Sequence, residues 1–533
     1  MIKLIRFLSI AAAVAGCLLV DRYASADETL TDDEVRRVVA IIDGHLESRW
    51  REDNITPSEP VGDAGFLRRA SLDINGQIPT VMEVREFLAD ERSDKRERLI
   101  DDLLDDPRYT VHFSNYWRKV LIPEAETNIQ ARYLTPGFEG WLRGKLLDNT
   151  SYRTMVREIL DVSVSGNSMY SYDAASPVAF YAAKEIKPEN LAAATSRMFL
   201  GVRIECAQCH DHPFDEWTRR DFWGYAAFFA GLERTRPGSG GFLAELREFF
   251  GQRKVQIPDT DEYVEPTFLG GDELQRGTAL TPRGALTEWI IADSNPYFAR
   301  MAVNRLWGHF FGVGFVDPVD DFSGLNPPSH PELLDDLAEE FIAHDYDLKF
   351  LMRTMTLSRA YQLSSRQTDP SQGEPHHFAR VRLKGLSPEQ VYDSLQQATG
   401  RFEPFSLQNP FIFGQETPRG RFGELFSDQG TTPTNRPTTV LQSLAMMNGD
   451  LVTTETSLEA SSLLGSVADF PGFDTGDRIE AVFLATLSRP PSDAERERFV
   501  TYVDGGGPHD DSQRALGDVM WALLNSSEFL YNH

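Results

Sequence analysis

Apolar residues recur at helical spacing along most of the chain. In residues 99–104, 333–341 and 348–355, Leu, Ile, Met and Phe are spaced so that they gather on one face of a helix. Four Ser or Thr residues stand three positions before a Glu or Gln, the spacing of a capping box at a helix start. These pairs are Thr80 and Glu83, Ser329 and Glu332, Ser387 and Gln390, and Ser492 and Glu495. The pattern predicts a mostly α-helical protein.

The helical pattern is interrupted twice. From about residue 236 to residue 283, Gly and Pro become frequent and the short pieces 254–257 and 263–264 favour strands. A second Gly- and Pro-rich stretch, residues 402–437, predicts a long surface loop. We therefore expect two helical domains joined by a short irregular, β-containing insertion. Their expected bounds are 30–230 for the first domain, 231–282 for the insertion and 283–533 for the second domain.

The N-terminus has the pattern of an export signal. Lys3 and Arg6 precede an apolar stretch over residues 7–20, and Ala24-Ser25-Ala26 provides small residues before a cleavage point. Residues 1–26 are therefore predicted to be a signal peptide of an exported protein, located in the periplasm, in the cell envelope or outside the cell. Two alternatives stay open: a lipoprotein lipidated on Cys17 and an uncleaved membrane anchor. No later segment is long and apolar enough to span a bilayer.

Composition narrows the function classes. The chain has 533 residues, of which 41% are hydrophobic, which is enough for sizeable cores and argues against a disordered chain. Its formal net charge of −28 argues against nucleic-acid binding, because phosphates are held by clustered Lys and Arg. Three cysteines cannot form a disulfide scaffold. Once residues 1–26 are removed, only Cys206 and Cys209 remain.

These two cysteines belong to the one chemical motif of the chain, Cys206-Ala207-Gln208-Cys209-His210. In c-type haem attachment, two thiols at this spacing bind the porphyrin and the following His is the axial iron ligand. Cys206 and Cys209 would then be the covalent anchors and His210 the ligand. Candidates for the sixth iron ligand are Met198, Met301, His309 and His330. Export is compatible with haem c, which bacteria attach outside the cytoplasm.

Two other interpretations of the motif remain open. Zinc could be bound by Cys206, Cys209 and one of His210 or His212, with Asp215 or a distant His as the fourth ligand. Alternatively, the two cysteines form a short disulfide in a non-catalytic surface scaffold. We expect His210 to determine the chemistry in either metal site, because His212 precedes Pro213 and is restricted to extended conformations. Whether the protein is an enzyme stays open.

Two further groups of polar residues have simpler interpretations. Asp317, Asp320 and Asp321 predict a solvated acidic turn, although carboxylates in this arrangement can also hold a cation. Asn304, Arg305, Trp307 and His309 lie on a predicted helix over residues 296–311. They are expected to form a buried polar network that joins two helices.

Several long motifs resemble one family. Residues 66–76 (FLRRASLDING), 199–203 (FLGVR) and the Cys motif with its continuation to Asp215 resemble a cytochrome-like domain of unknown function, the PSCyt type. Residues 295–300, 303–307, 327–332, 487–491 and 523–529 resemble a second domain of unknown function, the PSD type. Exported planctomycete-type proteins pair these two domains. The cytochrome label of the first domain rests on the same Cys motif, so the resemblance itself implies export and the pairing of the two domains. The motif makes an exported, haem-c-binding protein for redox chemistry the leading hypothesis, with a redox partner or an envelope component as its partner.

Overall fold

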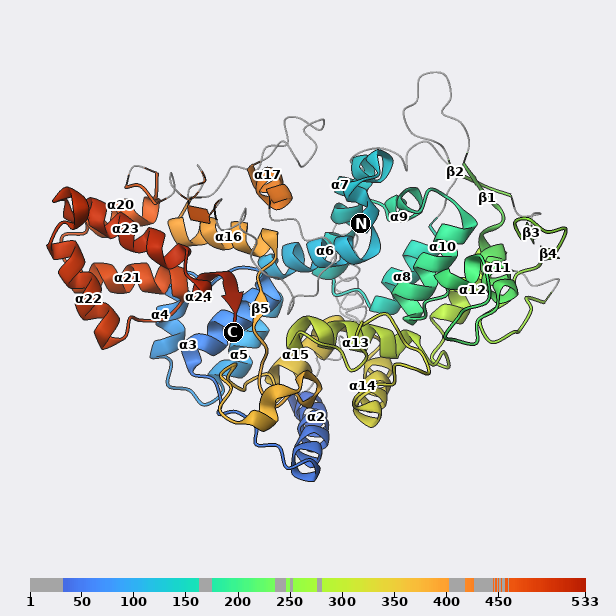
Figure 1. Cartoon of the computed structure of the whole chain (residues 1–533), viewed down its shortest axis with the longest axis horizontal. Helices are drawn as coiled ribbons and strands as arrows, with labels where there is room; N and C mark the ends of the chain where they lie inside the picture. The colour runs from blue at the N-terminus through green and yellow to red at the C-terminus, as the bar shows by residue number, and fades with distance from the viewer. Residues whose placement is uncertain are drawn as a thin grey trace, which may run out of the picture.

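The computed structural model describes residues 32–162, 175–234, 246–249, 253–275, 280–401, 418–425 and 460–533, together with scattered positions between 444 and 458. Helices dominate these residues (Figure 1), and their strands form three two-stranded antiparallel sheets. The expectation of a mostly α-helical protein is therefore confirmed. The signal peptide predicted over residues 1–26 and most of the loop predicted over residues 402–437 lie outside the described residues.

The first part of the chain is helical up to the β-containing insertion. Its α-helices are α2 (Asp32–Glu52), α3 (Asp63–Ala70), α4 (Val81–Ala89), α5 (Lys95–Asp105), α6 (Pro107–Leu121), α7 (Ile129–Leu147), α8 (Tyr152–Leu160), α9 (Ala179–Ala183), α10 (Pro188–Thr195) and α11 (Arg219–Ala226). Two π-helical turns, η1 (Ser71–Asn75) and η4 (Ser196–Leu200), continue α3 and α10. Short 3₁₀ turns are η2 (Pro123–Glu126), η5 (Glu205–Gln208) and η6 (Ala227–Phe229).

The insertion contains two of the three small sheets. Strand β1 (Leu232–Arg234) pairs with β2 (Leu246–Glu248), and β3 (Val255–Gln256) pairs with β4 (Tyr263–Val264). Both β3 and β4 fall within the pieces for which the sequence favours strands. Figure 1 shows the insertion at one end of the molecule, beside α11 and α12.

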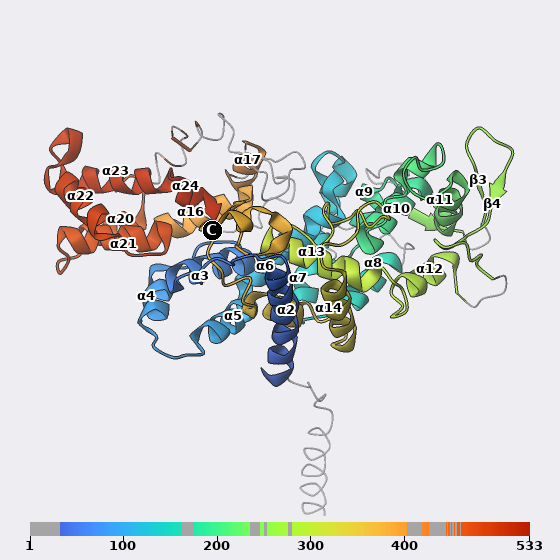
Figure 2. The same ribbon diagram turned by 60° about the horizontal axis from the view of Figure 1, so that its bottom comes forward.

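The remaining chain is again helical. Its α-helices are α12 (Pro282–Ile290), α13 (Phe298–Phe311), α14 (Pro331–Ala343), α15 (Leu348–Leu357), α16 (Pro388–Thr399), α17 (Pro418–Leu425), α20 (Ser462–Ala468), α21 (Thr475–Leu487), α22 (Asp493–Asp504), α23 (Ser512–Leu524) and α24 (Ser527–Leu530). Its 3₁₀ turns are η7 (Pro370–Gly373), η8 (Pro375–His377) and η11 (Gly507–His509). Strand β5 (Lys384–Gly385) pairs with β6 (Tyr531–Asn532), so the C-terminus returns to the middle of the molecule (Figure 2).

Helix starts follow the predicted capping boxes in three of four cases. Thr80, Ser387 and Ser492 each accept a hydrogen bond from the backbone three residues on, and the Glu or Gln side chain completes each box. The fourth prediction is wrong in detail: α14 begins at Pro331 with His330 as its N-cap and without a side-chain capping bond. Proline is favoured at the first helical position, and here it sets the start one residue beyond the predicted Ser329 cap.

Buried apolar residues form two cores. The first extends over residues 35–379 and also includes Leu484, while the second extends over residues 386–529 and also includes Leu72 and Ile78. Residues 283–379 thus share a core with the N-terminal part of the chain. The helices of the second core, α20–α23, lie at the opposite end of the molecule from the insertion (Figure 1).

The α3–η1 segment links the two cores. Leu72 on η1 is buried in the second core, whereas Phe66 on α3 is buried in the first. The segment ends at Gly76, whose φ of +72° lies in the left-handed region. A Cβ at Gly76 would stand 2.3 Å from Nδ1 of His112, so glycine is also needed for the close approach of α6.

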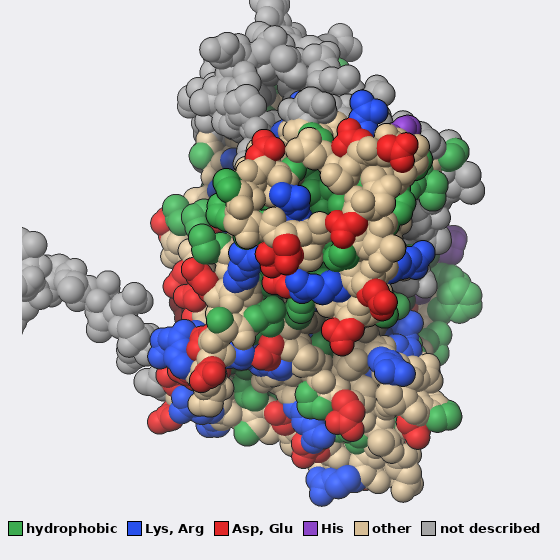
Figure 3. Space-filling model, turned by 90° about the vertical axis from the view of Figure 1, so that its left-hand side faces the viewer, with side chains coloured by type: hydrophobic (Ala, Val, Ile, Leu, Met, Phe, Trp, Pro, Cys, Tyr) green, Lys and Arg blue, Asp and Glu red, His purple; other side chains and the backbone are tan. Residues whose placement is uncertain are grey.

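The surface shows mixed charge at the end formed by the C-terminal helices. Figure 3 shows Lys and Arg interspersed with Asp and Glu on this face, and no broad area carries a single sign. Within the described residues, no helix has the length and apolar character needed to cross a membrane.

Candidate functional site

The Cys motif lies in an exposed loop between η4 and α11. Cys206 is on the 3₁₀ turn η5, and Cys209 follows that turn; both thiols are exposed and are not joined in a disulfide. Two buried contacts anchor the loop: Ala207 is fully buried, and Nε1 of Trp223 donates a hydrogen bond of 3.0 Å to the carbonyl of Gln208. The loop therefore presents two accessible thiols from a fixed base.

The two histidines of the motif differ in hydrogen bonding. Nδ1 of His210 lies 2.8 Å from the carbonyl oxygen of Asp211 and must donate, because a carbonyl only accepts. In neutral His210 this leaves the lone pair of Nε2 free. Nδ1 of His212 instead accepts from the backbone N–H of Phe214 at 3.3 Å, which places the proton of the neutral ring on Nε2. Only His210 thus offers Nε2 as a ready metal ligand.

The predicted zinc set is not assembled in this geometry. Among the described residues, no three or more His, Cys, Asp and Glu side chains group as a metal site would require. This holds for Cys206, Cys209, His210, His212 and Asp215. Asp215 accepts a hydrogen bond from the N–H of Glu216.

The candidates for a sixth iron ligand all make contacts elsewhere, and three of them, Met198, Met301 and His330, are buried. Met198 lies on η4 and Met301 on α13, with the Met301 sulfur against Gly201. The His330 ring packs on Phe315 and Phe378. Nε2 of His309 donates to the backbone oxygen of Asp73 at 2.9 Å. Within the described part of the chain, none of these contacts involves the Cys motif.

The two other predicted polar groups have structural roles. Asp320 pairs with Arg203 at 2.5 Å and with Arg197 at 3.4 Å, so the acidic turn is neutralised by arginines that precede the Cys motif. Asn304 is fully buried; its amide donates to the carbonyls of Val316 and Val319 and accepts from the N–H of Val316. Asn304 thus ties α13 to the following loop rather than to a second helix, and Nε of Arg305 and Nε1 of Trp307 are buried without a hydrogen-bond partner among the described residues, so the expected network joining two helices is wrong in detail.

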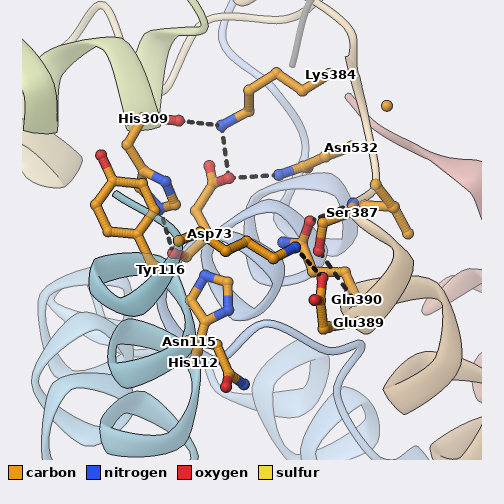
Figure 4. A pocket seen from close by; sticks show the side chains of 13 residues that line it. Asp73, His112, Asn115, Tyr116, His309, Lys384, Ser387, Glu389, Gln390 and Asn532 are labelled. Carbon is orange, nitrogen blue, oxygen red and sulfur yellow. Dashed lines mark hydrogen bonds and ion pairs between the residues drawn. The ribbon is translucent and has the colours of Figure 1, made fainter. Parts of the chain in front are cut away.

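A second candidate site is a cavity of about 130 Å³ near the junction of the two cores (Figure 4). Its walls come from η1, α6, α13, the segment from β5 to α16, and β6. The lining residues are Asp73, His112, Asn115, Tyr116, Lys119, His309, Lys384, Gly385, Leu386, Ser387, Glu389, Gln390 and Asn532. Unlike the Cys motif, this site is a partly open hollow with several polar groups in its wall that can contact a ligand.

Charged groups in the cavity wall are paired with one another. Asp73 accepts hydrogen bonds from Nζ of Lys384 at 2.6 Å, from Nδ2 of Asn532 at 2.8 Å and from the hydroxyl of Tyr361 at 2.8 Å. Lys384 also donates to the carbonyls of His309 and Phe310, which uses all three of its N–H groups. Burial raises the pKa of Glu389, but the ion pair with Lys119 outweighs burial and lowers this pKa to about 2.

Both histidines in the wall are neutral at ordinary pH. Burial lowers the pKa of His112 to about 3, and the neighbouring His309 acts in the same direction. Burial, together with Lys384, also lowers the pKa of His309 to about 3. The two rings lie 5.8 Å apart between centroids. Nε2 of His112 is buried and has no hydrogen-bond partner among the described residues.

The low pKa values of His112 and His309 predict that the folded protein loses stability in acid. Their pKa is about 3 in the folded state and 6.5 in the unfolded state, so the unfolded chain binds more protons between these values. Their stabilising contribution is present above pH 6.5 and is lost as the pH falls toward 3. Each histidine should add about 1.4 kcal/mol per pH unit to this loss. Denaturant titrations at several pH values from 7 to 4 give the free energy of unfolding, and its fall with decreasing pH should be less steep for His112→Gln than for the unmodified protein. An unchanged pH dependence would contradict the prediction.

The cavity residues were missed by sequence analysis, apart from His309. A signal was present in the spacing of His112, Asn115, Tyr116 and Lys119, which stand at positions i, i+3, i+4 and i+7 and so share one face of α6. A polar face on a helix with many apolar residues is expected to lie against either solvent or a polar cavity. The opposite wall comes from residues near 73, 385 and 532, and nothing local in the sequence brings these together.

Two segments of the chain match known families. Residues 41–234 match the PSCyt2 family, described as a protein of unknown function (DUF1549), and residues 282–419 match the PSD1 family, described as a protein of unknown function (DUF1553). No curated protein and no solved structure matches the chain significantly. The two matches contain the Cys motif and most of the cavity wall. The chain therefore belongs to the proteins that pair a PSCyt2 domain with a PSD1 domain, both of unknown function.

Proposed function

We propose that this is an exported, haem-c-binding protein with a single attachment site at Cys206, Cys209 and His210. The observation that carries the proposal is the state of these side chains: two free, exposed thiols next to a histidine whose Nδ1 is held by a carbonyl. A hydrogen bond at one ring nitrogen orients a histidine and leaves the other nitrogen for the metal. The residues present therefore fit the group.

Each residue of the site has a separate role. Cys206 and Cys209 would hold the porphyrin covalently, and Nε2 of His210 would bind its iron. A haem bound in this way supplies one-electron transfer. The protein itself contributes the fixed base of the loop, where Ala207 and the Trp223–Gln208 hydrogen bond hold the thiols and His210 in place.

The redox partner would contact the same loop. Phe214 is 73% exposed and stands between His212 and Asp215, with Asp211 also exposed nearby. An exposed aromatic side chain among polar neighbours is a common feature of contact sites. An acceptor or donor protein in the envelope would therefore meet the motif at Phe214.

The absorption spectrum of the protein purified from its exporting host tests the proposal. We expect a Soret band that stays with the polypeptide through acid-acetone extraction. Cys206→Ser combined with Cys209→Ser should release the haem in that extraction, and His210→Ala should shift the spectrum. His212→Ala is the matched control, because His212 is not placed to ligate, and its spectrum should be unchanged.

Zinc is the second candidate, and the same preparation distinguishes it. If the protein is colourless and contains stoichiometric zinc that a chelator removes, the site is a zinc site and the haem proposal is wrong. Zinc bound through Nε2 of His212, rather than of His210, would require His212 to give up its bond to Phe214, because the bonded tautomer carries its proton on Nε2. A protein with neither haem nor zinc would leave the surface scaffold as the remaining interpretation.

Export is a separate prediction. Cleavage after Ala26 should make Asp27 the first residue of the mature chain, because Ala24 and Ala26 are the small residues that signal peptidase accepts. Mass spectrometry of the intact exported protein measures this directly. A diacylated Cys17 at the N-terminus would instead establish the lipoprotein.

A further inference from the structure

The cavity beside α6 has hydrogen-bonding groups that the fold does not use. His112, Asn115 and Tyr116 all line it from one face of α6. Nε2 of His112 is buried without a partner, and the side chains of Asn115 and Tyr116 make no hydrogen bond within the described part of the chain. A buried polar group without a partner costs free energy, so natural proteins retain few of them without a reason. Figure 4 shows the His112 ring directed toward the middle of the surrounding side chains.

The charges of the wall leave no place for a charged ligand. Asp73 and Lys384 satisfy each other together with neighbouring groups, and Lys119 is paired with Glu389 at 2.6 Å. The polar groups of the wall that remain without a hydrogen-bond partner among the described residues are the imidazole of His112, the amide of Asn115 and the phenol of Tyr116. The imidazole of His112 is neutral, since burial lowers its pKa to about 3, and the phenol is neutral, since burial raises the pKa of Tyr116 to about 12. An ion held against these three groups would give up part of its hydration without gaining a counter-charge.

The size of the cavity limits the ligand further. Its volume of about 130 Å³ approaches the roughly 150 Å³ of a cavity that accommodates benzene. This is room for one six-membered ring and is far too small for a porphyrin, so the cavity is distinct from the haem site proposed at Cys206. The amide and the phenol can each donate and accept, and the neutral imidazole can do either at its free nitrogen. The hydroxyl groups of a ligand also donate and accept, so they can form hydrogen bonds with all three side chains.

We propose that this cavity is a binding site for a small, uncharged, hydroxyl-bearing ligand of the size of one sugar ring, held by His112, Asn115 and Tyr116. The three side chains stand at i, i+3 and i+4 on one rigid helix, which fixes their relative positions. Gly76 permits this arrangement, because any side chain there would meet the His112 ring. The ion pair between Lys119 on α6 and Glu389 on α16 ties this helix to the opposite wall.

Saturation-transfer difference NMR on the mature full-length protein tests the proposal. The probes are D-glucose and D-galactose, compared with D-glucuronate and protonated D-glucosamine as charged analogues of the same size. We expect transfer to at least one of the neutral hexoses and much weaker transfer to both charged sugars. No transfer to either neutral hexose at tens of millimolar, or stronger binding of a charged analogue, would overturn the proposal.

Single variants then place the binding in the cavity. Tyr116→Phe removes only the hydroxyl and keeps the ring packing, and should weaken hexose binding about fivefold, as expected for one hydrogen bond. Asn115→Ala should have a similar effect. Tyr502→Phe is the matched control, because the Tyr502 hydroxyl bonds Asp518 in the C-terminal helices. If Tyr116→Phe and Asn115→Ala bind like the unmodified protein, the hexose binds elsewhere and the proposal is wrong.

Discussion

Replacing Asp73 by alanine should destabilise the protein by about 3–5 kcal/mol, the usual cost of breaking a buried ion pair by removing one partner. The side chains of Asp73 and Lys384 are only 4% and 5% exposed. Without Asp73, the Lys384 ammonium would face two carbonyls but no counter-charge, and the Asn532 and Tyr361 donors would lose their acceptor. The free energy of unfolding from denaturant titrations of the mature chain gives the result.

An exposed ion pair provides the control for this experiment. Glu288 on α12 pairs with Arg157 at 3.1 Å, but both side chains are more than 40% exposed. Surface pairs contribute about 0–1 kcal/mol, so Glu288→Ala should have little effect. Asp73→Asn keeps the shape but not the charge, and should remain clearly less stable than the unmodified protein. A loss below about 1 kcal/mol for Asp73→Ala would contradict a structural role for the buried pair.

The helices could be predicted from the sequence because their signals are local. A capping box needs two residues three positions apart, and an amphipathic stripe needs only a few turns. Met352 and Met355, predicted to pack on a core face, are fully buried. The error at Ser329 arose from competition between two local signals, since Pro331 favours the first helical position and moved the cap to His330.

The arrangement of the two cores could not be predicted in the same way. Leu72 and Ile78 read as part of the first domain, yet their side chains are buried with residues more than 300 positions later. Such contacts depend on the path of the whole chain, and no periodicity in a single sequence encodes them. The cavity has the same origin, because Asp73, Lys384 and Asn532 meet only in the folded protein.

The Cys motif shows a different limit. Sequence spacing identified Cys206, Cys209 and His210 as a group, but it could not tell whether their side chains converge on a metal. The hydrogen bonds of the ring nitrogens separate His210 from His212, and they depend on the backbone of residues 211–217. These hydrogen bonds are a second reason, besides the restriction that Pro213 places on His212, to expect that His210 determines the chemistry, and the His210→Ala and His212→Ala pair tests it.

The buried side chain of Arg68 joins the two cores. It is 2% exposed and donates to the carbonyls of Thr486, Glu528 and Phe529. Thr486 lies in the last turn of α21, and the other two carbonyls belong to α24, where helix carbonyls lack intrahelical partners. Burial lowers the pKa of Arg68 to about 10, so the guanidinium is still charged at neutral pH. Arg68 therefore holds the C-terminal helices against α3.

We expect Arg68→Met to cost at least about 4 kcal/mol, since hydrogen bonds to a charged donor contribute about 1.5–3 kcal/mol each. The loss should fall mainly on the second core. In hydrogen exchange, amides of α21, α23 and α24 should lose protection far more than those of α6 and α13, because their packing against α3 depends on this side chain. Arg496→Met is the matched control, since Arg496 pairs with Glu480 on the surface of the same helices. Equal loss of protection in both cores would show that Arg68 supports the fold as a whole rather than the contact between its two cores.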